Sequence, residues 1–416
     1  MRKKLLYPLL ASCLFACSDK DTSYEVVKND LRAPAYPLVT IDPYASAWSM
    51  SDNLYDSPVR HWTGKDFPLI GVVKVDGVSY RFMGTEELEM NAIVPTSQQG
   101  EWTGRYITDK PAGDWTSADY NDSGWKSDRG AFGTKENEPT AKTQWGTRNI
   151  WVRRTVNIDR DLTGIPVYLE FSNDDDAVFY INGVKIHSTG TTCNKNKVVK
   201  LSDEALAALK QGDNIIAAEC INPVGNGLLD FGLQIPKHQE TVFGNTAVQT
   251  SADVQPMQTH YAFTCGDVDL KVTFTAPLFM EDLKLLSRPV NYLTYSVAAR
   301  DGKEHDVEVY FEASPRWALD QPYQQSASEG YEADGLLYLK SGSKEQNILA
   351  KQGDDLRIDW GYFYMVSGKE NTAYSIGNST ELRKNFVNGT FNSASLAGED
   401  SNGNMALVRD YGKVRK

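Results

Sequence analysis

Cysteine, histidine and long apolar runs are all scarce in this chain of 416 residues. It has five cysteines and five histidines, without a Cys-x-x-Cys pair or a His-Glu-x-x-His motif, so the sequence predicts no zinc site. Gly-x-Ser-x-Gly and phosphate-loop patterns are also missing, and nothing indicates a cofactor. Asp and Glu (55) exceed Lys and Arg (43), and a net charge of -12 argues against a nucleic-acid partner, because phosphate binding requires a basic face.

The one apolar run lies at the N-terminus. It extends from Leu5 to Phe15, whereas a helix that crosses a bilayer needs about 20 residues. It ends in Leu14-Phe15-Ala16-Cys17, which resembles a bacterial lipobox, whose cysteine is acylated. The resemblance implies a signal peptide over 1–16, lipidation of Cys17 and a polar tether over 17–30. We therefore expect an outer-membrane lipoprotein of Bacteroidetes type, periplasmic or surface-exposed, held by its lipid anchor; a plain secretory signal is the alternative.

Turn signals divide most of the remaining chain into short strands. Asp76-Gly77, Asn182-Gly183, Asp301-Gly302 and Asp334-Gly335 each lie between apolar, β-branched or aromatic segments, and such dipeptides tolerate the positive φ angles of tight β-turns. Helical signals are few, and the best one starts at Ser202 and stops at Gly212. We find no sustained helical periodicity in residues 320 to 416. The pattern predicts an all-β fold of sandwiches or jelly rolls.

Residues 99–237 form a predicted module of their own. Its opening, "WTSADYNDSGW", is followed by an Asn-Gly hairpin after an Asp-rich strand and by a final Gly-Asp-Asn strand. This order resembles the galactose-binding-like jelly roll, a fold that binds glycans in some proteins but not in others. Two questions stay open: whether residues 173–176 bind calcium or only end a strand, and whether Cys193 pairs with Cys220.

The flanks of this module, residues 31–98 and 238–416, carry a second resemblance. The stretches that carry it are Asp42-Pro43-Tyr44, His61-Trp62-Thr63-Gly64, Tyr80-Arg81-Phe82-Met83-Gly84, Ser287-Arg288-Pro289-Val290 and Trp317. They resemble the N-terminal half of the bacterial and fungal glutaminase A-like proteins, in which a β-sandwich precedes an (α/α) toroid. The resemblance implies a discontinuous β-sandwich interrupted by the jelly roll.

The same resemblance bears on function. The toroid is expected to hold the catalytic carboxylates, and the sequence ends at Lys416 before such a region begins. We therefore expect a non-catalytic N-terminal part of a glutaminase A-like protein, which acts on an amide or glycan substrate through a helical toroid partner. We assign no catalytic residue. The alternative is a stand-alone glycan-binding surface lipoprotein.

The strongest candidate for a ligand-lining segment is "VRHWTGKDF". Arg60 can clamp a carboxylate, His61 can donate or accept a hydrogen bond, Trp62 can stack on a flat ligand, and Asp66 lies close by in sequence. A long charged loop at a sandwich rim is a common place for binding residues. The structural alternative has Arg60 or His61 paired with a nearby aspartate and Trp62 as a packing anchor. For Arg288, Trp317 and the cluster Asp359-Trp360-Gly361-Tyr362 we favour structural roles.

Overall fold

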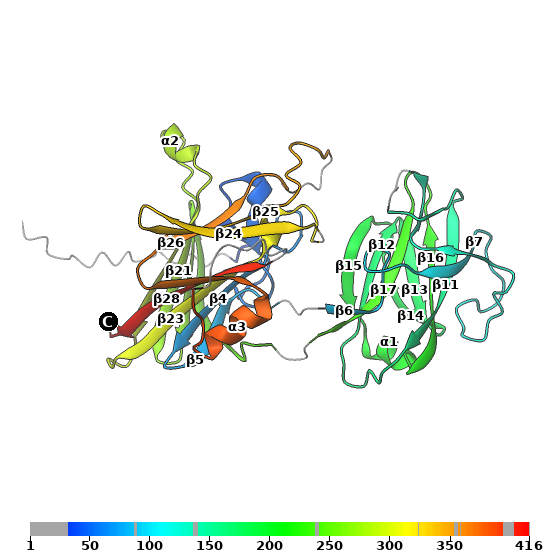
Figure 1. Ribbon diagram of the computed structural model, residues 1–416, viewed down its shortest axis with the longest axis horizontal. Helices are drawn as coiled ribbons and strands as arrows, with labels where there is room; N and C mark the ends of the chain where they lie inside the picture. The colour runs from blue at the N-terminus through cyan, green and yellow to red at the C-terminus, as the bar shows by residue number, and fades with distance from the viewer. Residues whose placement is uncertain are drawn as a thin grey trace, which may run out of the picture. The chain divides into compact units, whose positions relative to one another are not determined.

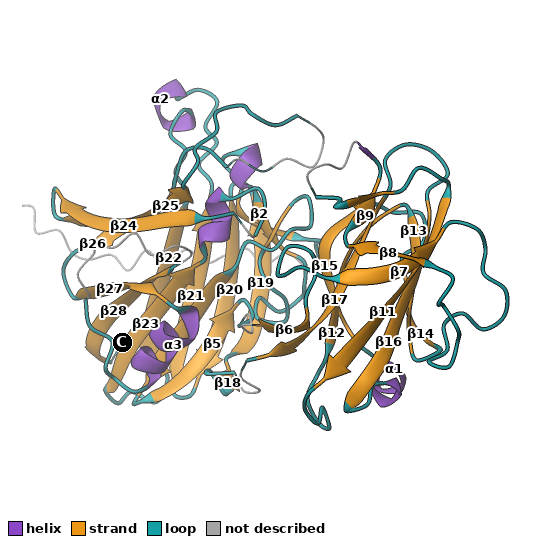
Figure 2. Ribbon diagram, turned by 45° about the vertical axis from the view of Figure 1, so that its right-hand side comes forward, coloured by secondary structure: helices purple, strands orange, loops and turns teal. Residues whose placement is uncertain are grey.

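The computed structural model describes residues 32–86, 90–135, 140–237, 241–322, 324–352, 357, 359–393 and 403–415. The predicted signal peptide, Cys17 and the tether lie outside these residues. The chain divides into two compact units, the first made of the residues up to Thr85 together with Asn245–Lys416, and the second of Glu86–Gly244 (Figure 1). Strands dominate both units, which confirms the predicted all-β class (Figure 2).

Unit 1 contains two larger sheets and two small ones. The larger sheets have the strand orders β18-β5-β4-β23-β28-β27 and β19-β20-β21-β22, and the small ones β1-β2-β3 and β24-β25-β26. The strands are β1 Tyr36–Val39, β2 Ala47–Ser49, β3 Arg60–His61, β4 Leu69–Val75, β5 Val78–Met83, β18 Asn245–Thr246, β19 Val248–Gln255, β20 Gln258–Cys265, β21 Val268–Thr275, β22 Tyr292–Ala299, β23 His305–Ala313, β24 Ser326–Ala333, β25 Leu336–Ser343, β26 Phe363–Gly368, β27 Thr372–Gly377 and β28 Asn404–Val414. Its helices are α2 Leu283–Leu286, α3 Ser379–Val387 and the 3-10 turns η1 Pro43–Ala45 and η3 Pro315–Ala318.

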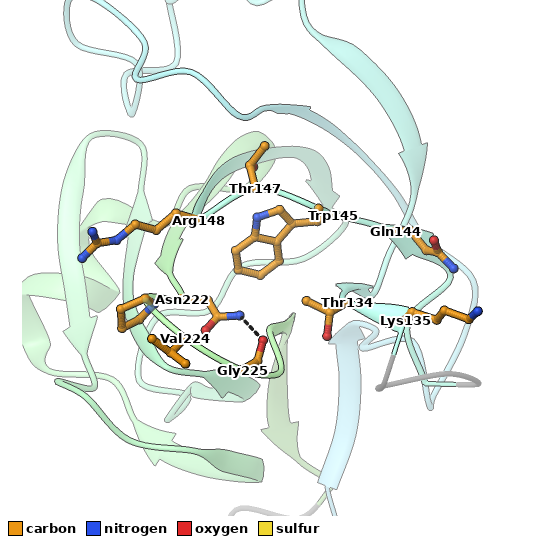
Figure 3. Close-up of a pocket in the computed structure, with 11 residues that line it drawn as sticks. Thr134, Lys135, Gln144, Trp145, Thr147, Arg148, Asn222, Val224 and Gly225 are labelled. Atoms are coloured by element: carbon orange, nitrogen blue, oxygen red, sulfur yellow. Dashed lines mark hydrogen bonds between the residues drawn. The ribbon is translucent and has the colours of Figure 1, made fainter.

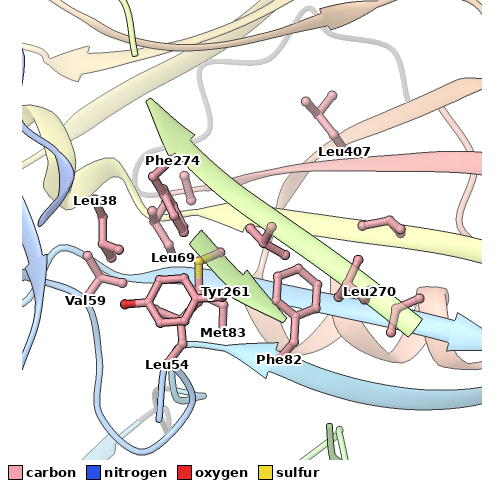
Figure 4. Packing of buried hydrophobic residues seen from close by; sticks show 14 of the residues in the cluster. Leu38, Leu54, Val59, Leu69, Phe82, Met83, Tyr261, Leu270, Phe274 and Leu407 are labelled. Atoms are coloured by element: carbon pink, nitrogen blue, oxygen red, sulfur yellow. The ribbon is translucent and has the colours of Figure 1, made fainter. Parts of the chain in front are cut away.

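The core of unit 1 comes from alternating strands. In β20 every second residue is buried, and in β21 the same alternation places Leu270 and Phe274 inside. These side chains meet Phe82 and Met83 of β5 in one apolar cluster (Figure 4). A period of two is the pattern of a sheet with one buried face, so the sandwich core follows directly from the sequence.

Unit 2 is built from two six-stranded sheets around a second core. One sheet has the order β10-β9-β17-β12-β15, with β6 also paired to β17, and the other the order β14-β13-β16-β11-β7-β8. The elements are β6 Met90–Val94, β7 Thr103–Ile107, β8 Lys126–Arg129, β9 Phe132–Gly133, β10 Thr143–Gln144, β11 Asn149–Ile158, β12 Tyr168–Asp174, β13 Asp176–Ile181, β14 Val184–Ser188, β15 Asn194–Lys200, α1 Asp203–Ala208, β16 Gly212–Ile221 and β17 Leu228–Pro236. Because β6 pairs with β17, unit 2 begins before residue 99, where we had placed its start.

The opening motif of the jelly roll has a packing role. Asp122 forms an ion pair with the buried Arg153 of β11 (2.8 Å), and the Arg153 guanidinium lies 5.3 Å from the ring centre of Tyr120. Trp125 contacts both Tyr120 and Trp115. The side chains of this motif therefore pack around the buried guanidinium of Arg153 and against one another.

Three of the four predicted turns are hairpins. Asp76-Gly77, Asn182-Gly183 and Asp334-Gly335 all have positive φ and join directly paired strands. Asp301-Gly302 does not form a hairpin, because the strands on either side of it belong to different sheets. β22 pairs with β21, whereas β23 pairs with β4 and β28.

The helices agree only in part with the sequence. Ser202 caps α1 as expected, by accepting a hydrogen bond from the Ala205 N–H, but α1 ends at Ala208. In residues 320 to 416, where we found no sustained helical periodicity, the described residues include one short α-helix, α3. Asn378 caps that helix by accepting from the N–H of Glu381, and Asn-x-x-Glu was the signal that we overlooked. Within the described residues, no helix is long and apolar enough to cross a membrane.

The two open questions about unit 2 concern its Asp-rich strand end and its cysteines. Asn173 donates to Thr189 Oγ1 (3.1 Å) and to the Thr192 carbonyl (2.9 Å), so its amide ties two neighbouring segments together. Burial and the adjacent Asp175 carboxylate raise the pKa of Asp174 to about 6. Cys220 is a buried free thiol and is not bonded to Cys193.

Candidate functional site

The segment "VRHWTGKDF" folds as a tight hairpin, not as an open loop. β3 pairs antiparallel with β2, with Ala47 opposite His61. The His61 N–H donates to the Lys65 carbonyl (2.8 Å), and the Gly64 N–H donates back to the His61 carbonyl (2.8 Å). Gly64 has φ +87°, a conformation that only glycine adopts readily.

His61 is the buried member of this hairpin. Its side chain has no exposed surface, its Nδ1 lies 2.9 Å from Thr63 Oγ1, and its Nε2 lies 3.2 Å from the Pro43 carbonyl oxygen. The imidazole also contacts the ring of Phe67, with 5.0 Å between centroids. Both ring nitrogens therefore have neighbours inside the protein, and His61 holds the hairpin against η1.

The other three candidates lie at the surface. Arg60 Nε is 2.9 Å from an oxygen of Asp66, and both side chains are more than a third exposed. Trp62 is 55% exposed, and its indole N–H donates to the Pro43 carbonyl (3.0 Å). The hairpin thus joins Arg60 to Asp66 and leaves about half of Trp62 exposed, while the Trp62 ring also contacts that of His61, with 5.6 Å between centroids.

A charged cluster, buried except for Lys351, lies beside the hairpin, and the sequence did not reveal it. Lys351 Nζ is 2.9 Å from Asp320 Oδ2 and 2.7 Å from Asp359 Oδ2. Arg357, which is 3% exposed, donates from Nε to the Asp320 carbonyl (2.7 Å) and from Nη1 to Thr63 Oγ1 (3.2 Å). Thr63 therefore connects His61 to a group of two cations and two carboxylates.

The pKa directions show that Asp320 and Lys351 stay ionised. Burial alone would raise the pKa of Asp320, but hydrogen bonds from Lys351 and from the Arg357 N–H outweigh it, and the net shift is downward. Burial would lower the pKa of Lys351, yet its contacts with Asp359 and Asp320 raise it. Because Asp320 and Lys351 are ionised and paired with each other, they supply neither a proton donor near neutrality nor a free base, so they suit positioning better than proton transfer.

Trp317 and Arg288 differ in their surroundings. Trp317 is 2% exposed, donates from its indole N–H to the Pro68 carbonyl (3.1 Å), and stacks on Phe363 with 4.9 Å between centroids. Arg288 is exposed and follows α2. Trp317 is therefore part of the core below the hairpin, as we expected.

One further group resembles a metal-binding arrangement. Asp267, Asp301 and His305 place one ligand atom each within 4.8 Å of one another. However, His305 Nδ1 lies 2.6 Å from Asp76 and Nε2 lies 3.0 Å from Asp301, so both nitrogens already face carboxylates. This geometry is that of an imidazolium held by two anions.

Comparisons with known proteins match both flanks of the jelly roll. A domain of unknown function, DUF4964, matches residues 9–95, and a second, DUF5127, matches residues 257–416. Glutaminase A of Aspergillus oryzae (strain ATCC 42149 / RIB 40) is 27% identical over 169 residues, which make up 40% of this chain and 24% of that protein. The match thus spans about a quarter of the length of the curated relative.

Solved structures share much less with this chain. Beta-glucuronidase 2 of Bacteroides uniformis, covalently bound to cyclophellitol-6-carboxylate aziridine, is 10% identical, with a TM-score of 0.28 over 70% of this chain and 33% of that one. A beta-glycosidase from Bacteroides vulgatus is 12% identical, with a TM-score of 0.25 over 70% and 34%. At such scores the likeness supports no inference about this chain.

The fold defines an all-β protein in which a β-sandwich unit is interrupted by a jelly roll. The two domain matches fall on the interrupted unit, on either side of the inserted one. Together with the similarity to glutaminase A, these matches support a glutaminase A-like family member.

Proposed function

We propose that this chain is the non-catalytic β part of a glutaminase A-like surface lipoprotein, and that the bond-breaking groups lie on a helical domain that docks on unit 1. The predicted lipid on Cys17 would hold the assembly at the outer membrane. The charged cluster beside His61 supports this division of labour, because its ions are paired with one another. An amide substrate is inferred from the relative named glutaminase A.

The observation that carries the proposal is the exposed apolar surface of two loops in unit 1. In the loop that contains α2, Met280 is 83% exposed and Leu283 is 73% exposed. In the loop after β25, Ile348 is 71% exposed and Leu349 is 77% exposed. Both loops extend from the same end of unit 1 (Figure 1). Exposed apolar groups in this concentration are typical of interaction surfaces.

Unit 1 also exposes several aromatic side chains. Trp62 and Tyr362 are 55% and 50% exposed, and Phe279 next to Met280 is 49% exposed. Tryptophan, tyrosine and phenylalanine are enriched in the cores of protein interfaces, where they bury large areas at low entropic cost. A docked helical domain would cover these side chains and bring Trp62, Arg60 and Asp66 to the edge of its active site.

Docking can be measured with the helical region of a longer family member, produced separately. We expect that region to bind the chain, and Met280→Glu together with Leu283→Glu to weaken binding at least about tenfold, because a buried unpaired charge opposes apolar contact. Val198→Glu, at a half-exposed valine of unit 2, is the matched control and should bind like the unchanged chain. Equal binding by all three proteins would contradict the proposed surface.

Ammonia release from L-glutamine tests the non-catalytic assignment. We expect the chain alone to release ammonia no faster than buffer, because its buried carboxylates Asp320 and Asp359 are both engaged by Lys351. A longer glutaminase A-like protein assayed in parallel serves as the positive control. Turnover by the isolated chain at about 1 per second or faster would overturn the assignment.

A further inference from the structure

Unit 2 has a cavity of its own at one end of the jelly roll, with a volume of about 480 Å³. Its lining comes from residues that directly follow or precede strands: Thr134 follows β9, Trp145 follows β10, Arg148 precedes β11 and Asn222 follows β16. Volumes of this size are ordinary for small-molecule sites. We propose that this cavity binds a small acidic saccharide, meaning a sugar unit that carries a carboxylate or a sulfate.

The cavity wall is fixed by backbone hydrogen bonds between the segments that form it. The Trp145 N–H donates to the Gly133 carbonyl (2.9 Å), the Asn222 N–H to the Arg148 carbonyl (2.8 Å), and the Thr134 N–H to the Gly227 carbonyl (2.9 Å). Gly227 leaves no room for a side chain, since an added Cβ would lie 2.8 Å from Asn222 Nδ2. A preformed wall lowers the entropic cost of binding a ligand.

Among the residues that the structure describes, two buried polar groups in this wall have no hydrogen-bond partner. Trp145 is 1% exposed and its Nε1 has no partner, while Asn222 is 7% exposed and its Oδ1 has none, although its Nδ2 donates to the Gly225 carbonyl (3.1 Å). In Figure 3 the Trp145 ring lies at the centre of the lining residues, with the Asn222 amide next to it. Buried donors and acceptors are nearly always paired, so an unmatched pair in one wall indicates a site that a polar ligand or a bridging water completes.

The charge of the lining selects the class of ligand. Lys135 and Arg148 line the cavity, and none of the lining residues that the structure describes is acidic, in a chain whose net charge is -12. Figure 3 shows the two cations on opposite sides of Trp145 with their charged ends directed away from it, and both side chains are exposed, so that a change of rotamer is needed to turn them toward a ligand. Arginine and lysine bind carboxylates and sulfates through charge-assisted hydrogen bonds, which are stronger than neutral ones.

The remaining groups suit a hydroxylated ligand. Thr134 Oγ1 accepts from the Gly227 N–H (3.1 Å) and so keeps its own proton for donation. Thr147 Oγ1 donates to the Asn149 carbonyl (3.0 Å) and so keeps its lone pairs for acceptance. Val224, which is 86% exposed at the lip, offers an apolar contact for a sugar face. Donors, acceptors and an apolar edge around one cavity match the mixed surface of a saccharide.

Calorimetric titration of the full chain tests the proposal with D-glucuronate, D-glucose 6-sulfate and D-glucose as probes. We expect at least one of the two acidic sugars to bind, and glucose to bind at least about tenfold more weakly. Binding of glucuronate alone would identify a carboxylate, and binding of the sulfate ester alone would identify a sulfate. No binding of either acidic sugar at about 50 mM, or equal binding of glucose, would overturn the proposal.

Matched variants locate the site. Lys135→Gln and Arg148→Gln should each weaken binding of the acidic sugar about tenfold, since each removes one charge from the cavity. Arg160→Gln is the control, because Arg160 is also an exposed arginine and lies just beyond the opposite end of β11. If Arg160→Gln weakened binding of the acidic sugar equally, the attraction would be a non-specific effect of charge, and the proposed site would be rejected. Inorganic sulfate that binds as tightly as the sugars would reject the saccharide.

Discussion

His305 shows how one residue of unit 1 links stability to pH. Its Nδ1 lies 2.6 Å from Asp76 and its Nε2 lies 3.0 Å from Asp301, and these contacts raise the pKa of the imidazole. The same contacts lower the pKa values of Asp76 and Asp301. The two sequence segments meet only because β4 and β23 pair, so that a turn residue of one hairpin reaches the first residue of β23.

The sign of this effect follows from the raised pKa. Stabilisation by protonated His305 is complete below the unfolded pKa of about 6.5 and is lost as the pH rises through the higher folded pKa. We therefore expect His305→Gln to lower the free energy of unfolding at pH 6 more than at pH 9, as measured by urea denaturation. His260→Gln is the contrasting control, because burial lowers the pKa of His260 and its pH-dependent effect appears below pH 6.5 with the opposite sign. Parallel pH profiles for the unchanged chain and His305→Gln would contradict this reading.

At the scale of elements, α3 is attached to the main sheet of unit 1 by a buried ion pair. Arg383 donates from Nε and Nη2 to the two oxygens of Glu312 on β23, at 2.8 and 2.7 Å. Phe386 of the same helix contacts the ring of Tyr310, and Lys74 Nζ donates to the Phe386 carbonyl at the helix end (3.1 Å). The positive charge of Lys74 at the C-terminal end of α3 also interacts favourably with the helix dipole.

Removal of one partner should therefore cost much more than removal of both. We expect Arg383→Met to lower the free energy of unfolding by about 3–5 kcal/mol, because it leaves the Glu312 carboxylate buried without its cation. Glu312→Met combined with Arg383→Met should recover part of this loss. Urea denaturation of the two single variants and the double variant measures the coupling, and strictly additive effects would show that the pair is not coupled.

At the scale of the whole molecule, unit 2 is inserted where its two ends can lie close together. β18 pairs with β5, which places Asn245, the first residue of the second segment of unit 1, beside Tyr80. The first segment ends shortly afterwards, at Thr85. Within unit 2 the two ends are also joined, since the Glu86 carboxylate accepts from the N–H groups of Val242 and Phe243 (2.9 and 2.8 Å). Each unit has its own apolar cluster. Insertions of this kind leave both folds intact.

The two units should consequently fold separately. We expect residues 86–244 alone, and unit 1 with residues 86–244 replaced by a short Gly-Ser linker, each to show a cooperative thermal transition by circular dichroism. Their strand-rich spectra should sum to that of the whole chain. A linker variant that fails to fold while residues 86–244 fold would show that unit 1 depends on its insert.

The sequence by itself determined the strand class, three tight turns, the family and the existence of an inserted module. These features are local: a dipeptide with positive φ, a period of two, or a short motif such as the one that contains Asp122 and Trp125. Our predicted boundary at residue 99 missed β6, because a strand assignment at an edge depends on its partner β17, which lies more than a hundred residues away.

Only the tertiary structure decided the surroundings of the candidate site. The sequence singled out His61 and Trp62, but it did not show that one is buried and the other exposed. Nor did it bring Arg357 to Thr63 across 294 positions of the chain. Contacts of this range arise from strand pairing and core packing, and no local pattern of residues encodes which distant side chains will meet.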